Sequence, residues 1–143
     1  MPAAEQTGQG TDTVKDFSIV SDFARQIGVV RIEAEGGRSR VWLESRQDAR
    51  NPKGDVHGGA LAAVCDVAMA RAVRSANVEL WGLSTVSMTI NYLEPVGGAV
   101  VAHGTLVKNG GTLAFAEVVV LNADGVAALR GSGVFRKIRV KAT

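Results

Sequence analysis

The sequence has few of the residues that build covalent links or metal sites. Cys65 is the only cysteine among 143 residues, so no disulfide can form within the chain. The two histidines, His57 and His103, are too few for a histidine-rich or Cys/His metal cluster. We therefore expect no metal ion and no other cofactor, and the lone cysteine fits the reducing cytoplasm.

Long apolar runs and a strong excess of one charge are also missing. No apolar stretch approaches the ~18 residues of a membrane-spanning helix, and the first residues lack the apolar core of a signal peptide. Lys and Arg number 16 against 14 Asp and Glu, an excess too small for a nucleic-acid-binding surface. We therefore expect no membrane insertion and no nucleic-acid partner, which leaves a small molecule as the expected partner.

Length and composition predict one folded domain. A chain of 143 residues can bury about two-thirds of its unfolded surface and is too short for a second domain of ordinary size. Residues 1–13 are polar and contain glycine, and we expect a disordered tail there and a single domain over 14–143. From Arg130 to the C-terminus the chain carries five basic residues and no acid, which fits either a solvated strand end or a patch for an anionic ligand.

The stretch from Asn51 to Ala76 combines a Pro/Gly-rich loop, a His-Gly-Gly step and an alanine-rich helical pattern. Asp66 is the only acid inside the helical part. Its neighbours at helical spacing are Ala62, Ala63, Met69 and Ala70. A carboxylate in such surroundings is costly without a partner or a chemical task. Asp66 is therefore a candidate catalytic group, and the alternative is a structural carboxylate at a subunit interface.

Gly58 and Gly59 fall where this helix is predicted to begin. Their N–H groups are among the donors that a first helical turn leaves free, at the positive end of the helix dipole. A glycine backbone can be approached closely, so these donors suit a phosphate or a developing oxyanion. Because the G-K-[ST] sequence of a nucleotide-binding P-loop is absent, we favour the oxyanion.

The spacing of these two features predicts a homodimer. Gly58 and Asp66 are eight residues apart, which places them about 12 Å apart along one helix. A base and an oxyanion donor that act on one carbonyl must each lie about 3 Å from the reacting atoms, so one helix cannot supply both. Two helices packed antiparallel about a two-fold axis would place Asp66 of one chain near Gly58 of the other, which gives two shared sites.

The remaining pattern predicts an α+β fold. Apolar residues at helical spacing from Asp16 to Ile27 predict a short helix that ends at Gly28. Elsewhere, alternating segments predict strands, and the glycine-rich segments between them predict antiparallel turns. The predicted strands are Val29 to Ala34, Ser39 to Leu43, Leu83 to Leu93, Val100 to Lys108, Leu113 to Leu121 and Val126 to Arg136. Two strands, one long helix and four strands place an apolar helix against one antiparallel sheet.

This order, with His57-Gly58-Gly59 at the helix start and Asp66 nine residues after the histidine, resembles the hotdog-fold acyl-CoA thioesterases, in particular the phenylacetate-pathway and human thioesterase-superfamily group. The similarity covers roughly Arg31 to Lys137. Further matches are Asn51, the strand Ser84 to Leu93 with Pro95 after it, and the turn Lys108 to Gly111. The resemblance implies the hotdog fold, a long helix wrapped by an antiparallel sheet, and an acyl-CoA substrate.

The resemblance also implies roles for individual residues. Asp66 matches the acid that activates water or attacks the thioester, Gly58 the amide that polarises the thioester carbonyl, and His57 the histidine that shapes the carbonyl pocket. Asn51 matches a residue of the partner chain's loop that helps to place the attacking water, and Thr85 one that supports this water beside the acid. The expected coenzyme A contacts are Gly59, Lys108, Asn109, Gly110 and Arg136. The implied assembly is a dimer with antiparallel helices, and we expect dimers to pair into a homotetramer.

Several alternatives stay open. A hotdog dehydratase or hydratase would move protons at the α and β carbons of an acyl thioester with a His and an acid, but such enzymes carry a Pro-rich loop where Gly58 and Gly59 stand here. A non-catalytic acyl-CoA binding module is the other alternative. His57 could contact the substrate or bond to the backbone to hold its turn. Cys65 is a poor candidate nucleophile, because consecutive helical residues point about 100° apart and it cannot share a small site with Asp66.

Overall fold

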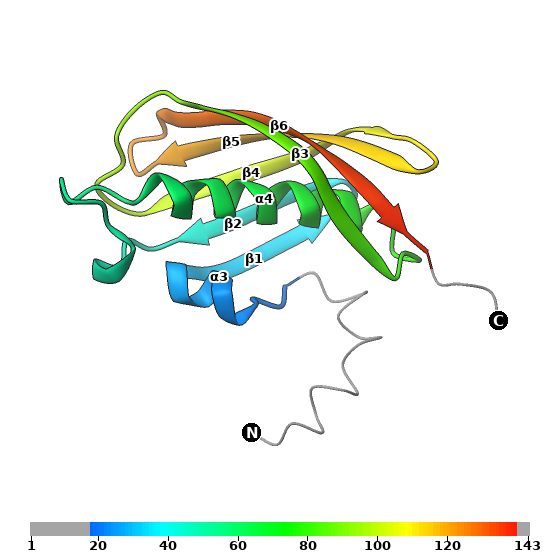
Figure 1. Cartoon of the computed structure of the whole chain (residues 1–143), viewed down its shortest axis with the longest axis horizontal. Coiled ribbons are helices and arrows are strands. Elements are labelled where there is room, and N and C mark those ends of the chain that lie inside the picture. Colours follow the sequence, from blue (N-terminus) through cyan, green and yellow to red (C-terminus); the bar gives the residue numbers. More distant parts are fainter. Residues whose placement is uncertain (1–17, 140–143) are drawn as a thin grey trace, which may run out of the picture.

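A six-stranded antiparallel sheet curls around one long helix in the computed structural model, which describes residues 18–139 (Figure 1). In chain order the elements are α3 (Asp22–Ile27), β1 (Val29–Glu35), β2 (Arg38–Leu43), the 3₁₀ helix η1 (Gln47–Ala49), α4 (Gly58–Ser75), β3 (Gly82–Tyr92), β4 (Val100–Asn109), β5 (Leu113–Asn122) and β6 (Ala127–Ile138). The sheet order is β1-β2-β4-β5-β6-β3. The hotdog fold predicted from the sequence is confirmed. The predicted tail, 1–13, lies outside the described residues.

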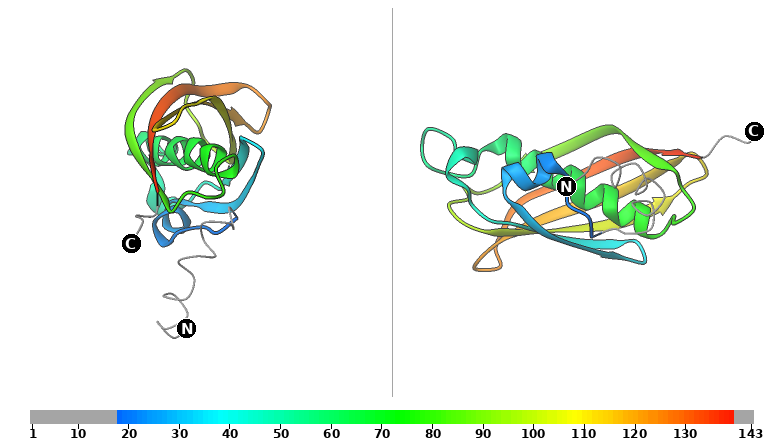
Figure 2. Two further views of the ribbon diagram at one scale, coloured as in Figure 1. Left: turned by 90° about the vertical axis from the view of Figure 1, so that its right-hand side faces the viewer. Right: turned by 90° about the horizontal axis from the view of Figure 1, so that it is seen from below.

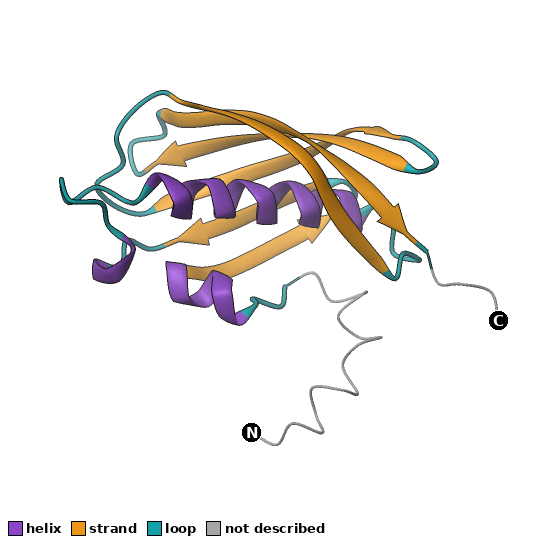
Figure 3. Ribbon diagram, in the orientation of Figure 1, coloured by secondary structure: helices purple, strands orange, loops and turns teal. Residues whose placement is uncertain are grey.

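The sheet wraps α4 rather than lying flat beneath it. In the end-on view of Figure 2 the strands curve around the helix, and Figure 3 shows α4 as the one long helix along the inside of that curve. No helix of the described part is long and apolar enough to cross a membrane. One side of α4 therefore packs against the sheet, and its opposite side is not covered by the sheet.

Helix α3, the first within residues 18–139, is shorter than the sequence pattern predicts. Ser21 is its N-cap, because the Ser21 Oγ accepts a hydrogen bond from the Ala24 N–H at 3.2 Å. Gly28 ends it in the left-handed conformation, with φ of 112°, as expected for a glycine after a helix. The predicted end is therefore confirmed. The predicted start at Asp16 is wrong, since residues 18–21 are not helical and α3 begins at Asp22.

The position of β3 corrects the predicted run of consecutive hairpins. The Pro95-Val96-Gly97-Gly98 stretch was expected to turn the chain directly into β4, yet β3 pairs with β6 at the far edge of the sheet. The intervening segment instead passes the start of α4, where the Val56 N–H donates to the Val96 carbonyl oxygen at 2.7 Å. The β1–β2, β4–β5 and β5–β6 hairpins form as predicted. As a result β3 is an edge strand that runs across α4 (Figure 1).

The close approach of α4 to the sheet depends on a glycine in β4. A Cβ at Gly104 would lie 2.3 Å from the Ala68 carbonyl oxygen, in the middle of α4, and 2.5 Å from Ser39 Oγ. The Ser39 hydroxyl donates a hydrogen bond to that same carbonyl. Near the end of the helix, Ser75 Oγ accepts a hydrogen bond from the Gly37 N–H at 2.9 Å. These contacts fix α4 both along the sheet and in rotation about its own axis.

The fixed orientation of α4 about its own axis divides its residues into a buried set and a partly buried set. The side against the sheet is fully buried and packs on core residues such as Phe135. Its members include Val64, Cys65, Ala68, Met69, Ala72 and Val73. The opposite side is only partly buried. It carries Ala62, Ala63, Asp66, Val67 and Ala70. Asp66 therefore lies on the half-open side of the helix, among small and apolar side chains.

Replacing Gly104 by alanine tests this packing. The new Cβ would overlap a backbone oxygen of α4, so the helix would have to move, and we expect a loss of about 3 kcal/mol in the free energy of unfolding. Urea unfolding measures it, with Gly98→Ala as the control because a Cβ at Gly98 meets nothing within 4 Å. Equal stabilities of Gly104→Ala and the parent would show that α4 does not lie this close to β4.

Candidate active site

The structure brings Asp66 and Thr85 together. The Thr85 hydroxyl donates to Asp66 Oδ1 at 2.6 Å. Thr85 pairs with Phe135 of β6, whose side chain is buried, so Thr85 faces α4, and the pairing becomes irregular immediately after it. Among the described residues, Asp66 Oδ2 has no hydrogen-bond donor. One carboxylate oxygen is thus held in place and the other is available to a ligand or a water.

The first turn of α4 leaves one backbone donor free. His57 is the N-cap, and its Nδ1 accepts a hydrogen bond from the Gly59 N–H at 2.8 Å. The next two N–H groups, of Ala60 and Leu61, donate to the His57 carbonyl oxygen at 2.9 and 3.2 Å. In the described part of the chain no acceptor faces the Gly58 N–H. Of the two glycines, Gly58 therefore offers a donor to a ligand, whereas the Gly59 N–H is used by His57.

The hydrogen bond from Gly59 defines the tautomer of a neutral His57 ring. Because Nδ1 accepts a hydrogen bond, a neutral His57 ring carries its proton on Nε2. His57 was expected either to contact the substrate or to hold its backbone turn, and the structure shows the bond that holds the turn. The same bond leaves Nε2–H as a donor.

Asn51 organises the loop that precedes α4. Its Oδ1 accepts hydrogen bonds from the N–H groups of Lys53, at 3.0 Å, and Asp55, at 3.1 Å. Asn51 and Asp55 also pair through their backbones, since the Asn51 N–H donates to the Asp55 carbonyl oxygen at 2.8 Å. The loop borders a hollow of about 290 Å³ together with Gly58 and Tyr92. Asn51 thus lies beside the helix start, with its oxygen engaged and its Nδ2 without a bond to another described residue.

Tyr92 is a site residue that the sequence shows only as part of a strand pattern. Its hydroxyl donates to the Gly58 carbonyl oxygen at 2.6 Å, and its ring lies 3.6 Å from where a Cβ of Gly58 would stand. Desolvation by burial, followed by the nearby Cys65, raises the pKa of Tyr92 above its usual value. The hydroxyl therefore keeps its proton at neutral pH and acts as a donor. The signal that could have revealed it is its pairing with buried Leu129, which turns Tyr92 toward α4, but pairing across a sheet is not visible in one sequence.

The predicted coenzyme A contacts lie far from Gly58 of the same chain. Residues 108–110 cover the end of β4 and the first residue of the β4–β5 turn, near the C-terminal end of α4, where Asn77 Nδ2 donates to Asn109 Oδ1 at 3.0 Å. The 18 residues of α4 span about 27 Å, which separates this turn from the helix start. Arg136 is exposed, next to buried Phe135, on the sheet face that points away from α4. One chain does not bring these residues to Gly58, so their contact with coenzyme A stays a prediction.

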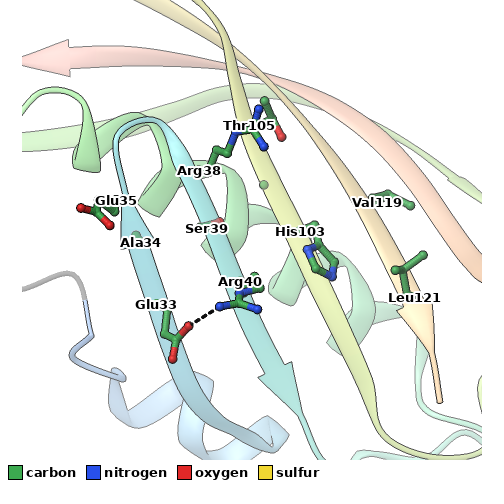
Figure 4. Close-up of a pocket in the computed structure, with 11 residues that line it drawn as sticks. Glu33, Ala34, Glu35, Arg38, Ser39, Arg40, His103, Thr105, Val119 and Leu121 are labelled. Carbon is green, nitrogen blue, oxygen red and sulfur yellow. Dashed lines mark hydrogen bonds and ion pairs between the residues drawn. The ribbon is translucent and has the colours of Figure 1, made fainter. Parts of the chain in front are cut away.

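A larger hollow, of about 880 Å³, lies on that outer face of the sheet (Figure 4). It is lined by β1, β2, β4 and β5, with Arg38, Arg40 and His103 among its polar side chains. One of these is already paired, because Arg40 donates to Glu33 at 2.9 Å. The sheet separates this hollow from Asp66. It is therefore no part of the candidate active site. Within residues 18–139, no three His, Cys, Asp or Glu side chains gather as they would around a metal ion.

Comparison with known proteins identifies the family of the chain. The family model of the Thioesterase superfamily matches residues 53–128, a range that contains His57, Gly58, Asp66, Thr85 and Tyr92. The chain belongs to the thioesterase superfamily. A protein of Halobacterium salinarum named "Putative esterase" is 31% identical over an alignment of 124 residues, which covers 79% of this chain and 82% of that protein.

Solved structures share the fold of this thioesterase-superfamily chain. A mutant of phenylacetic acid degradation protein PaaI from Thermus thermophilus has 24% identity and a TM-score of 0.73, with 84% of this chain and 100% of that chain covered. A Streptococcus mutans protein bound to acetyl CoA has 22% identity and a TM-score of 0.69, with 80% and 90% covered. At these identities the likeness establishes the fold. The predicted thioesterase superfamily is confirmed by the family model, and the phenylacetate-pathway group within it stays a prediction.

The neighbour of Asp66 in sequence gives a direct test of the helix rotation. Cys65 is fully buried, and burial first and the Asp66 charge second raise the pKa of its thiol to about 12. Because the thiolate is the reactive form, we expect no labelling of the native protein by a thiol reagent near pH 8. One thiol per chain should react in urea, which serves as the control. Rapid labelling of the native protein would place Cys65 on the open side of the helix.

Proposed function

We propose that this protein is an acyl-CoA thioesterase, which hydrolyses an acyl- or aryl-CoA thioester to a free acid and coenzyme A. The observation that carries the proposal is the hydrogen bond from Thr85 to Asp66, which holds a carboxylate on the half-open side of α4. Membership of the thioesterase superfamily supports the reaction class. The similarity to a protein bound to acetyl CoA supports a coenzyme A thioester as the ligand.

In the proposed reaction Asp66 acts as a general base. Its free Oδ2 takes a proton from water while the water oxygen attacks the thioester carbonyl carbon. The carbonyl oxygen gains negative charge, which the Gly58 N–H of the partner chain stabilises. When the C–S bond breaks, the thiolate of coenzyme A leaves and takes up the proton from Asp66. Attack by Asp66 itself, through a mixed anhydride that water then opens, would use the same residues.

The half-open side of α4 supports a site shared by two chains. Small side chains surround Asp66 there, so the α4 helix of a second chain can approach closely. Antiparallel packing about a two-fold axis can set the middle of each helix opposite the start of the other, so that the C-terminal half of each helix runs past its partner's first turn. We therefore propose a homodimer with Asp66 of one chain facing Gly58 of its partner, and pairing of dimers into a homotetramer. The same packing would place residues 108–110 more than about 13 Å beyond the partner's Gly58 along the helix, on the side where a coenzyme A that extends away from the thioester could reach them.

The remaining site residues have proposed supporting roles. Thr85 orients the Asp66 carboxylate, and Asn51 of the partner chain would offer its Nδ2 to the attacking water. His57 holds the turn that presents Gly58 and offers Nε2–H to the carbonyl pocket. These roles need no metal and no further cofactor, because water is the second substrate.

Asp66→Asn tests the general base. The amide keeps the size of the side chain and can still accept the Thr85 hydrogen bond, but it cannot take a proton from water, so turnover should fall at least 10²-fold with little change in KM. Asp124→Asn, in the exposed β5–β6 turn, is the matched control and should behave like the parent. Release of free thiol from phenylacetyl-, benzoyl- and straight-chain acyl-CoA measures turnover. Near-parental turnover of Asp66→Asn would exclude this mechanism, and a parent that turns acyl-CoA over without releasing thiol would favour a dehydratase.

Mixed dimers test the shared site. We consider dimers with Asp66→Asn in one chain and Gly58→Val in the other, purified through two different affinity tags. In the shared-site arrangement both changes fall in one site, and the other site keeps an intact Asp66 and an intact Gly58. We expect about half of the parental activity per dimer, against the very low activity of either mutant homodimer. Mixed dimers no more active than the homodimers would show that each chain carries its own site.

A further inference from the structure

A chain of hydrogen bonds connects the end of β3 to the start of α4. The Tyr92 hydroxyl donates to the Gly58 carbonyl oxygen at 2.6 Å, and the N–H of the same peptide group, that of Gly59, donates to His57 Nδ1 at 2.8 Å. A peptide group that accepts at its oxygen and donates at its nitrogen is polarised by both bonds, so each bond strengthens the other. Tyr92 and His57 therefore hold opposite ends of one peptide plane.

The Tyr92 ring adds a second constraint at the same residue. Its Cε1, Cζ and hydroxyl oxygen all lie 3.6 Å from the position of a Cβ on Gly58, so the ring packs against the bare Cα of that glycine. Glycine has the widest choice of backbone conformations, and two adjacent glycines make the first turn of a helix easy to deform. The hydrogen bond and the ring contact together restrict the residue whose N–H is free.

Strand β3 contacts both groups that the proposed reaction needs. At one end Thr85 donates to the Asp66 carboxylate, and at the other Tyr92 donates to the Gly58 carbonyl oxygen. Both side chains pair with buried residues of β6, so both face α4. Tyr92 thus has the same relation to the oxyanion donor that Thr85 has to the acid.

We infer that Tyr92 is a positioning residue of the thioesterase reaction, which holds the Gly58–Gly59 peptide so that the Gly58 N–H stays directed at the thioester oxygen. The inference rests on the proposed function. Tyr92 does not touch the reacting atoms and acts through Gly58. Because an oxyanion donor acts mainly in the transition state, a loss of its orientation lowers kcat and leaves KM nearly unchanged. A residue that only fastened β3 to α4 would alter stability without this kinetic signature.

Tyr92→Phe is the decisive variant, because it keeps the ring contact with Gly58 and removes only the hydroxyl. We expect kcat for acyl-CoA hydrolysis to fall about tenfold with a change in KM below about twofold, as for the loss of one hydrogen bond realised in the transition state. The control is Thr89→Val, which removes a hydroxyl from the same strand on the sheet face that points away from α4. It should keep parental kcat and KM.

Amide hydrogen exchange gives a readout that does not depend on activity. In the parent the Gly59 amide should be protected by its bond to His57, and in Tyr92→Phe it should exchange about tenfold faster while the thermal midpoint stays close to that of the parent. Faster exchange together with reduced kcat supports the inference. Parental kcat in Tyr92→Phe, with or without faster exchange, overturns it, since Tyr92 is then only a structural contact. A parent without thioesterase activity is a different result, which overturns the proposed function before any variant is compared.

Discussion

The closeness of α4 to the sheet is the constraint on which the other features depend. Gly104 has no side chain, so the Ala68 carbonyl group lies directly against β4 and the Ser39 hydroxyl bonds to it. A helix held this tightly cannot rotate, because rotation would drive side chains of its buried side into the strands. The orientation of α4 about its own axis therefore decides which of its residues are buried. Cys65 faces the core and Asp66, one residue later, faces the open side.

The elements could be predicted from the sequence, but the order of the strands could not. The pattern from Leu83 to Leu93 locates β3 to within one residue at each end, because alternation is a local property. Its partner strand is decided by contacts between distant residues, such as the bond between Val56 and Val96 that carries the chain past the helix start. The glycines after Pro95 look like a hairpin turn in one sequence. They serve a longer connection in the fold.

Only part of the candidate site could be predicted, again because one sequence shows local patterns but not contacts between distant residues. Asp66 is conspicuous in the sequence as the only acid in an alanine-rich helix, and the resemblance to thioesterases supplied Thr85 as its neighbour. The free Gly58 N–H follows from the helix start alone. Tyr92 was not predicted as a site residue, since its contact with Gly58 exists only because β3 runs across α4. The sequence also does not show which backbone N–H donates to the His57 ring, and the structure shows that it is the N–H of Gly59.

The position of β3 at the sheet edge has a consequence for the synthesis of the chain. β2 can pair with β1, and β4 and β5 can join them as each is made, but among the described strands β3 has its one partner in β6, which comes after all the others in the chain. Until then a finished strand of mostly exposed residues has no neighbour, and pairing over so long a separation is slow. The pairing that turns Thr85 and Tyr92 toward α4 forms only with β6. The candidate site is therefore complete only after β6 has been made, and a nascent chain that stops short of β6 contains Asp66 and Gly58 without the strand pairing that holds Thr85 and Tyr92 against α4.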